Sequence, residues 1–273
     1  MSLQNRLDQT FASLREQNQS ALIPYITAGD PSADGTLAMM HTLVESGADI
    51  IEIGVPFSDP MADGPVIQRA HERALKTNLG LRGVLDLVAR FRQDNTDTPV
   101  VLMGYQNPIE AMGVAQFAKK AADCGVDGVL TVDLPPEEAD ALTDQLQSHG
   151  MHAVFLIAPT TGENRVAAVA ERAGGFVYYV SLKGVTGATN LEASKLEAQL
   201  MPVRSRCQLP VGVGFGIRDA DSAAAVARVA DAVIIGSAIV QLAHEHAHEP
   251  EQMHAQVGAF VREIKHAIAN ARH

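Results

Sequence analysis

Eight short apolar runs recur along the chain and are separated by segments with helical spacing. The runs are nearly continuously hydrophobic instead of alternating, which indicates a parallel sheet that is buried on both faces. Segments between them, including SADGTLAMMHTLVESG, GVLDLVARFRQDN, EADALTDQLQSHG and DADSAAAVARVA, are amphipathic. The pattern predicts a single (β/α)8 TIM barrel over residues 1–273, with a doubly wound open sheet as the main alternative. The predicted strands are residues 21–27, 49–54, 99–105, 126–132, 152–158, 176–182, 209–215 and 231–237.

Four further segments add detail to this barrel. LQNRLDQTFASLREQ, before the first strand, has helical spacing and is expected to close the bottom of the barrel. A short helix is expected after the eighth strand, where barrels often bind phosphate. The loop at residues 56–65 has no apolar period, and the polar stretch at 182–194 has the composition of a mobile lid.

Composition and charge narrow the function classes. The chain has 273 residues, of which 47% are hydrophobic, and its formal net charge is -11, which argues against a nucleic-acid partner. No apolar run approaches the roughly 18 residues of a membrane helix, and the polar N-terminus does not resemble a signal peptide. Cys124 and Cys207 lie far apart without metal spacing. We therefore expect a cytoplasmic enzyme or binding protein with reduced, buried thiols.

Glu52 is an acid within an apolar strand, IIEIGV. It lies two residues before Gly54, near the C-terminal end of the strand, where barrel enzymes place their ligands. Apolar surroundings would raise its pKa towards a value suited to proton transfer. The structural alternative is a glutamate paired with a lysine or arginine, but buried acids are rare outside functional sites, which favours catalysis.

Two aspartates follow in the same stretch, and both have structural explanations. Asp63 precedes a segment that begins with Pro65, so a helix N-cap is the stronger local interpretation. Asp59 lies in a Ser-Asp-Pro turn. Spacing alone would make neither of them catalytic.

Two glycine-rich turns follow the seventh and eighth strands. VGVGFGIRDA contains Gly212, Gly214 and Gly216, and DAVIIGSAIV contains Gly236 and Ser237. Tight turns would explain each glycine alone, but the pair at this position favours a phosphate site built from backbone N–H groups. The spacing does not match the dinucleotide motif.

The histidines and tyrosines give weaker signals. The HEHAH segment at residues 244–248 places two imidazoles on one helix face, yet no third ligand is suggested and no metal is predicted. Tyr25, Tyr105, Tyr178 and Tyr179 lie in or near predicted strands and could line a pocket for a flat ligand, or simply pack.

Several motifs together resemble the tryptophan synthase alpha subunit family over nearly the whole chain. They are LIPYITAGDP (22–31), IIEIGVPFSDPMADGPVIQ (50–68), LMGYQNP (102–108), DLPPEE (133–138), YYVSLKGVTG (178–187), GVGFGI (212–217) and IIGSAIV (234–240). The resemblance implies a lyase that splits indole-3-glycerol phosphate into indole and glyceraldehyde 3-phosphate. It implies that Glu52 is the general acid/base and that Asp63 accepts the indole N1–H and stabilises the protonated ring.

The resemblance also assigns the remaining site residues. It places Tyr178 beside the glutamate and makes Thr186 the lid threonine that helps to position Asp63. From their positions near strand ends, we also expect Tyr25 and Tyr105 to contact the substrate. The implied phosphate cradle consists of Gly187, Phe215, Gly216, Gly236 and Ser237.

A partner subunit is implied as well. The family's beta subunit carries pyridoxal phosphate, receives indole and forms an α2β2 heterotetramer, whereas no cofactor is expected in this chain. Pro56 and Asp59 would belong to the loop that communicates with that partner. The alternatives are another phosphate-binding barrel enzyme, which would show a catalytic lysine or metal ligands at strand ends, and a ligand-binding allosteric subunit without activity.

Overall fold

The eight predicted strands form a closed parallel barrel in the order β1 to β8, in a computed structural model that describes residues 5–180, 190–214 and 216–272. The open-sheet alternative is therefore wrong. All eight strands are confirmed, with ends that differ by up to two residues from the predicted ones. They are β1 Ala21–Thr27, β2 Ile51–Gly54, β3 Val100–Gly104, β4 Gly128–Thr131, β5 His152–Ile157, β6 Val177–Val180, β7 Val211–Gly214 and β8 Ala232–Ile235.

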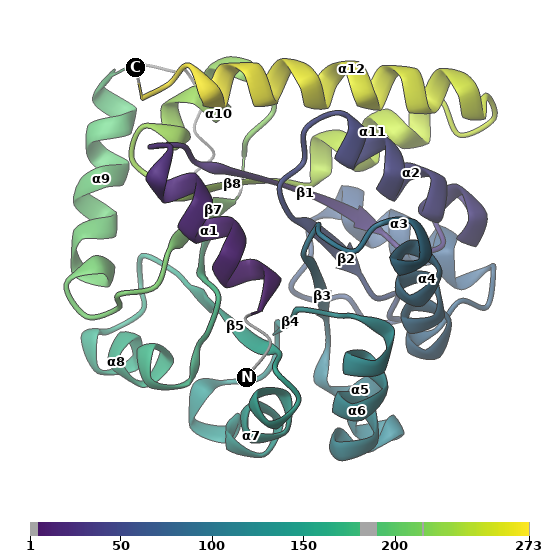
Figure 1. Cartoon of the computed structure of the whole chain (residues 1–273), viewed down its shortest axis with the longest axis horizontal. Helices are drawn as coiled ribbons and strands as arrows, with labels where there is room; N and C mark the ends of the chain where they lie inside the picture. Colours follow the sequence, from purple (N-terminus) through teal and green to yellow (C-terminus); the bar gives the residue numbers. More distant parts are fainter. Residues whose placement is uncertain (1–4, 181–189, 215, 273) are drawn as a thin grey trace.

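Helices surround the barrel, and their apolar faces pack on the outward-facing strand residues (Figure 1). The links after β2, β3 and β8 each hold two helices. The α-helices are α1 Arg6–Glu16, α2 Ala33–Glu45, α3 Pro65–Leu75, α4 Leu81–Asp94, α5 Gln106–Met112, α6 Val114–Cys124, α7 Asp140–Ser148, α8 Glu163–Arg172, α9 Asn190–Arg204, α10 Ala220–Ala227, α11 Ser237–Glu245 and α12 Pro250–Ala269, and a 3-10 turn spans Pro136–Glu138.

Inside the barrel, alternate residues of each strand face the axis and form a second apolar core. This core includes Ile50, Val101, Leu130 and Phe176, all buried. Because side chains alternate along a strand, Ile50 facing inward places Glu52 on the same inner side, one layer nearer the C-terminal ends. The strand period alone thus directs this glutamate into the barrel.

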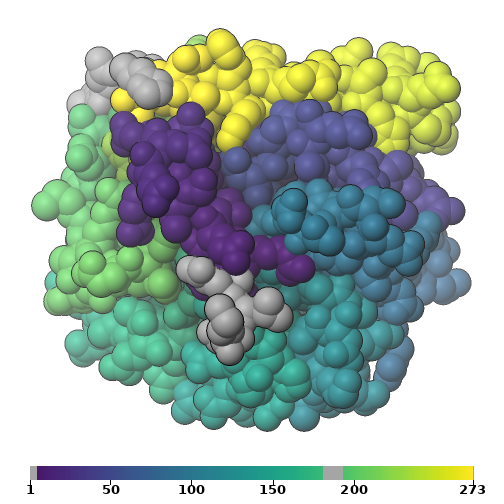
Figure 2. Space-filling view, in the orientation of Figure 1, coloured from purple at the N-terminus to yellow at the C-terminus, as the bar shows by residue number. Residues whose placement is uncertain are grey.

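The N-terminal helix α1 closes the bottom of the barrel, as predicted. Leu7, Phe11 and Leu14 pack with the inward-facing strand residues, and the Phe11 and Phe176 ring centroids lie 5.7 Å apart. In the space-filling view, α1 (purple) lies over this face of the molecule (Figure 2). The N-terminal end is thus sealed, which leaves the C-terminal ends of the strands for a site.

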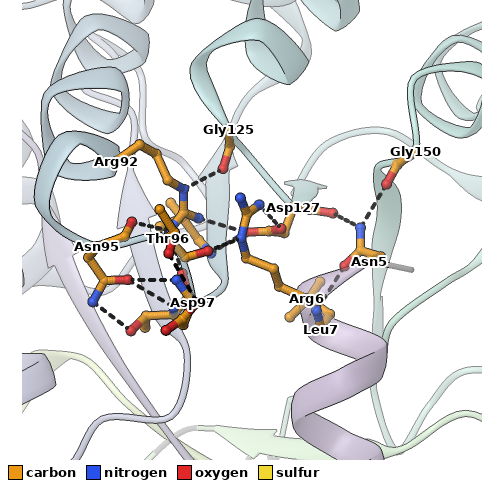
Figure 3. Close-up of polar contacts among 12 residues, drawn as sticks. Asn5, Arg6, Leu7, Arg92, Asn95, Thr96, Asp97, Gly125, Asp127 and Gly150 are labelled. Carbon is orange, nitrogen blue, oxygen red and sulfur yellow. Dashed lines mark hydrogen bonds and ion pairs between the residues drawn. The ribbon is translucent and has the colours of Figure 1, made fainter. Parts of the chain in front are cut away.

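A polar network fastens α1 to the barrel around the buried carboxylate of Asp127 (Figure 3). The guanidinium groups of Arg6 and Arg92 donate to its two oxygens at 2.9 and 2.8 Å. Asn5 donates to the carbonyl oxygens of Asp127 and Gly150 at 2.9 and 2.8 Å. Since each oxygen of the carboxylate is paired, its burial is compensated.

Asp127 is one of three aspartates that lie just before an even-numbered strand. Each accepts, through its carboxylate, a backbone N–H at the start of the preceding odd-numbered strand, and each also pairs with a lysine or arginine. The donor and acceptor pairs are Leu22 and Asp49 (2.6 Å), Val100 and Asp127 (2.8 Å), and Val211 and Asp231 (2.9 Å).

Candidate active site

Glu52 lies inside the barrel near its C-terminal end and is 1% exposed. Neither carboxyl oxygen has a hydrogen-bond partner among the described residues. Burial raises its pKa from 4.5 to about 8, and the nearby charge of Asp63 adds to the shift. The alternative of a structural ion pair is therefore wrong for the described part of the chain. This carboxyl group holds its proton at neutral pH.

Two tyrosines surround Glu52, and each lies over a glycine. Tyr25, the register partner of Glu52 on β1, packs so closely that a Cβ on Gly54 would lie 2.0 Å from its hydroxyl oxygen. Tyr178 on β6 lies against Gly214 in the same way, at 2.2 Å. Burial raises the pKa of both phenols, so each stays protonated beside the acids.

Gly214 therefore has a packing role within β7, where the sequence suggested a phosphate-binding turn. Gly212, in the same strand, likewise leaves room for Ile234 and Phe176. Gly216, beyond the strand, has a φ of +76° and forms a turn that favours glycine.

Asp63 lies in the loop between β2 and α3, and its carboxylate is 4% exposed. The N-cap interpretation is wrong, because Gly64 occupies the N-cap of α3 and no side chain caps that helix. Instead, the hydroxyl of Tyr105 donates to Asp63 Oδ2 at 2.7 Å. Burial raises the pKa of Asp63, while the hydrogen bond from Tyr105 and then the proximity of His71 oppose that shift.

The same loop is fixed by further contacts with its surroundings. The Phe57 ring stacks on Tyr105 with centroids 4.8 Å apart, and the Tyr105 hydroxyl accepts the Ala62 N–H at 3.1 Å. Gln68, on α3, donates to the carbonyl oxygen of Asp63 at 2.8 Å. Tyr105 thus holds both the backbone of the loop and the Asp63 carboxylate.

His71 is a site residue that the sequence analysis missed. It is 2% exposed, its Nδ1 accepts the Phe57 N–H at 3.1 Å, and its Nε2 lies 3.7 Å from Asp63 Oδ2. The available signal was helical spacing, because Ala70 and Ala74 are buried on the same face of α3. The acidic and basic neighbours of His71 in the sequence concealed this signal.

The predicted phosphate residues are only partly described. Gly214 pairs with Ile234 in the β7–β8 register, so Gly216 and Gly236 each follow two residues later, beyond the ends of these adjacent strands. Ser237 begins α11, the predicted helix after β8. Phe215, Gly187 and Thr186 lie outside the described residues, as does most of the predicted lid; its last five residues begin α9.

The predicted communication loop has a buried and an exposed part. Pro56 is buried, whereas Asp59 is exposed and accepts a hydrogen bond from the Ser58 hydroxyl at 2.6 Å. Met61 follows with 83% of its surface exposed. The tip of the loop thus presents an apolar and an acidic side chain to solvent.

Neither a metal-binding cluster nor a membrane-spanning helix is found among the described residues. These contain no group of three or more histidine, cysteine or acidic side chains that could hold a metal ion. None of the helices within the described ranges has the length and apolar character needed to span a membrane. Cys124 and Cys207 are buried free thiols, as expected.

The arrangement suits a reaction that moves protons without a cofactor. A buried acid that is neutral at pH 7 lies near a second acid, whose negative charge is favoured by a hydroxyl donor. Two carboxyl groups in unlike environments can divide proton transfer and charge stabilisation between them.

Comparisons with known proteins identify the family of the chain. The family model for the tryptophan synthase alpha chain matches residues 11–269. Alpha chains from Thioalkalivibrio sulfidiphilus and Burkholderia thailandensis are 54% and 57% identical to this chain over 97% and 98% of its length, and over 99% and 98% of their own.

Solved structures agree as well. The alpha subunit from Legionella pneumophila matches with a TM-score of 0.90 and 45% identity, over 97% of this chain and 99% of its own. A tryptophan synthase structure from Mycobacterium tuberculosis matches with a TM-score of 0.86 and 39% identity, over 97% and 98% of the two chains. With both sequence and fold matched over nearly their full length, the chain belongs to the tryptophan synthase alpha chain family.

Proposed function

We propose that Glu52 and Asp63 divide the chemistry of the alpha reaction between proton transfer and charge stabilisation. As a member of its family, the chain is an enzyme subunit that catalyses this reaction of tryptophan biosynthesis, the cleavage of indole-3-glycerol phosphate. The family match does not support the two alternatives, another phosphate-binding barrel enzyme and an inactive allosteric subunit. One observation carries the residue assignment: Glu52 is a buried carboxyl group without a partner among the described residues and with a pKa of about 8.

Glu52 starts the reaction in its neutral form. It donates its proton to indole C3, which turns the ring into a cation and an electron sink. The resulting carboxylate then removes the proton from the C3′ hydroxyl, the C3–C3′ bond breaks, and its electron pair returns to the ring. Indole and an aldehyde result, and Glu52 regains a proton. A pKa near neutrality suits a group that acts in both directions.

Asp63 stabilises the cation that this proton transfer creates. In this role its carboxylate accepts the indole N1–H and so attracts the positive charge of the protonated ring. The hydroxyl of Tyr105, at 2.7 Å, favours the ionised form and holds one oxygen, so the geometry is set before the charge develops. The rings of Tyr25 and Tyr178, both buried near Glu52, supply walls for a flat substrate.

The phosphate group would lie at the turns after β7 and β8. Gly216, Gly236 and Ser237 occupy these turns, and the first N–H groups of α11 lack partners within the helix, which favours an anion there. Gly187 and Phe215 complete the proposed cradle, with Thr186 in the lid. This arrangement fixes one end of the substrate and leaves the indole towards Asp63.

Membership of the family implies a beta-subunit partner. We propose an α2β2 assembly in which pyridoxal phosphate belongs to the beta subunit, and in which Pro56 and Asp59 form part of the contact. The exposed Met61 beside Asp59 gives this loop an apolar point of contact. Addition of purified beta subunit is expected to raise the cleavage rate, and an unchanged rate would count against the partnership.

Glu52→Gln tests the central assignment, because it keeps the shape of the side chain and removes the transferable proton. We expect indole release to fall by about 1,000-fold, the scale of a lost general acid/base. Binding of indole-3-glycerol phosphate, followed by calorimetry, should survive. Glu72→Gln, at an exposed position on α3, is the matched control. Near-normal turnover in Glu52→Gln would refute the assignment.

A further inference from the structure

His71 connects the backbone of the β2–α3 loop to the carboxylate of Asp63. Its two ring nitrogens contact different partners, with Nδ1 at 3.1 Å from the backbone nitrogen of Phe57 and Nε2 at 3.7 Å from Asp63 Oδ2. The side chains of His71 and Asp63 are both buried, at 3% and 4% exposure. A polar contact at this depth is only weakly screened by solvent.

The contact with Phe57 fixes which nitrogen carries the proton. A backbone N–H can only donate, so Nδ1 must accept and therefore has no proton. In the neutral ring the proton then lies on Nε2, the atom that faces Asp63. Burial lowers the pKa of His71, and the proximity of Asp63 only partly offsets this, which favours the neutral ring. The loop backbone thereby directs an N–H dipole at the carboxylate.

We propose that His71 is a positioning residue that couples the conformation of the β2–α3 loop to the ionised state of Asp63. The inference rests on the proposed role of Asp63. Tyr105 provides the direct hydrogen bond to Oδ2, and the Nε2–H of His71 adds a dipole 3.7 Å from the same oxygen. When the loop leaves its position, Nδ1 loses the Phe57 N–H and the preference for the Nε2 proton disappears. The loop position is thus transmitted to the charge that holds the indole nitrogen.

Two conservative substitutions separate the two contacts. The amide of asparagine reaches the place of Nδ1, so His71→Asn keeps an acceptor for Phe57 and loses the distal N–H. The amide of glutamine reaches the place of Nε2, so His71→Gln keeps a donor for Asp63 and loses the acceptor. His71→Ala removes both. His254→Gln, at a histidine of α12 that contacts Thr42, is the control for changing a histidine elsewhere.

Steady-state cleavage of indole-3-glycerol phosphate measures the contact between His71 Nε2 and Asp63. We expect His71→Asn to lower kcat about tenfold with little change in KM, because the N–H dipole that faces the buried carboxylate is lost. His71→Gln should keep kcat within about threefold and raise KM, because the loop is less well held. Equal kcat and KM in wild type, His71→Asn and His71→Gln would overturn the proposal.

Amide hydrogen exchange at Phe57 measures the contact between the Phe57 N–H and His71 Nδ1, and it requires no turnover. Exchange should become about tenfold faster in His71→Gln and His71→Ala, and stay near the wild-type rate in His71→Asn. Equal exchange in all variants would overturn the proposed anchor. If the wild type released no indole, the proposed function would fail, while the exchange rates would still decide whether His71 holds the loop.

Discussion

Glu52→Gln should make the protein more stable while it removes activity. The carboxyl group of Glu52 is buried without a partner among the described residues, and burial raises its pKa from 4.5 to about 8. Between these two values the folded state keeps a proton that the unfolded chain releases. Raising the pH across this window therefore favours unfolding of the wild type. Glutamine has a similar shape and does not titrate, so the variant lacks this pH-dependent loss.

The size of the effect follows from the two pKa values. Each pH unit between them costs the wild type about 1.4 kcal/mol of folding free energy. At pH 7 the span from 4.5 is about 2.5 units, which corresponds to a loss of about 3 kcal/mol. The loss is absent well below pH 4.5 and constant above about pH 8. The buried amide of the variant has a desolvation cost similar to that of the neutral acid, so the difference between the two proteins reports mainly this ionisation.

Urea unfolding followed by circular dichroism between pH 5 and 8.5 measures the difference. We expect Glu52→Gln and wild type to differ least at pH 5 and to diverge by about 4 kcal/mol at pH 8. Glu72→Gln should follow the wild type throughout, since its side chain is exposed. A constant difference between Glu52→Gln and wild type across this range would show that Glu52 is not held neutral by burial.

Three other substitutions separate catalysis from stability. Asp63→Asn should lower kcat/KM by about 100-fold with the barrel still folded, because the carboxylate caps no helix; a drop in melting temperature alone would instead favour a structural role. Tyr105→Phe keeps the ring that stacks on Phe57 and removes the donor to Asp63, so kcat should fall about tenfold, and unchanged kinetics would show that the hydroxyl is dispensable. Asp127→Ala leaves the largely buried Arg92 without its carboxylate and should cost about 3 kcal/mol in urea unfolding, with normal kcat for the folded protein. Impaired catalysis at full stability would contradict this division.

The sequence predicted the barrel and the position of Glu52 because both follow from strand periodicity. Continuous apolar runs indicate a sheet buried on both faces, and alternation within β2 carries Glu52 to the inner side with Ile50. These are short-range properties, so neighbouring residues are enough to reveal them. The N-terminal helix was predictable for the same reason, since Leu7, Phe11 and Leu14 follow helical spacing.

Contacts across the β2–α3 loop were not predictable in this way. Asp63 resembled an N-cap in the sequence. In the structure it lies one residue before the N-cap position of α3, which Gly64 occupies. Tyr105, just after β3, and His71, on α3, meet Asp63 at separations that no local pattern encodes. The family resemblance assigned Asp63 a role without these partners. Side chains that come together only after the loop folds back require the structure.

The three aspartates that lie just before even-numbered strands, Asp49, Asp127 and Asp231, also bear on how the barrel assembles. Each joins an odd strand to the next even strand across only 27, 27 or 20 residues of chain, in β1–β2, β3–β4 and β7–β8 respectively. Contacts between residues close in sequence form with a small loss of chain entropy. A circular permutation with new ends between Leu22 and Asp49 would turn one such local contact into a distant one, and the chain should fold more slowly than one opened between β2 and β3. The carboxylates would then favour strand pairs, rather than single strands, as the units that form first.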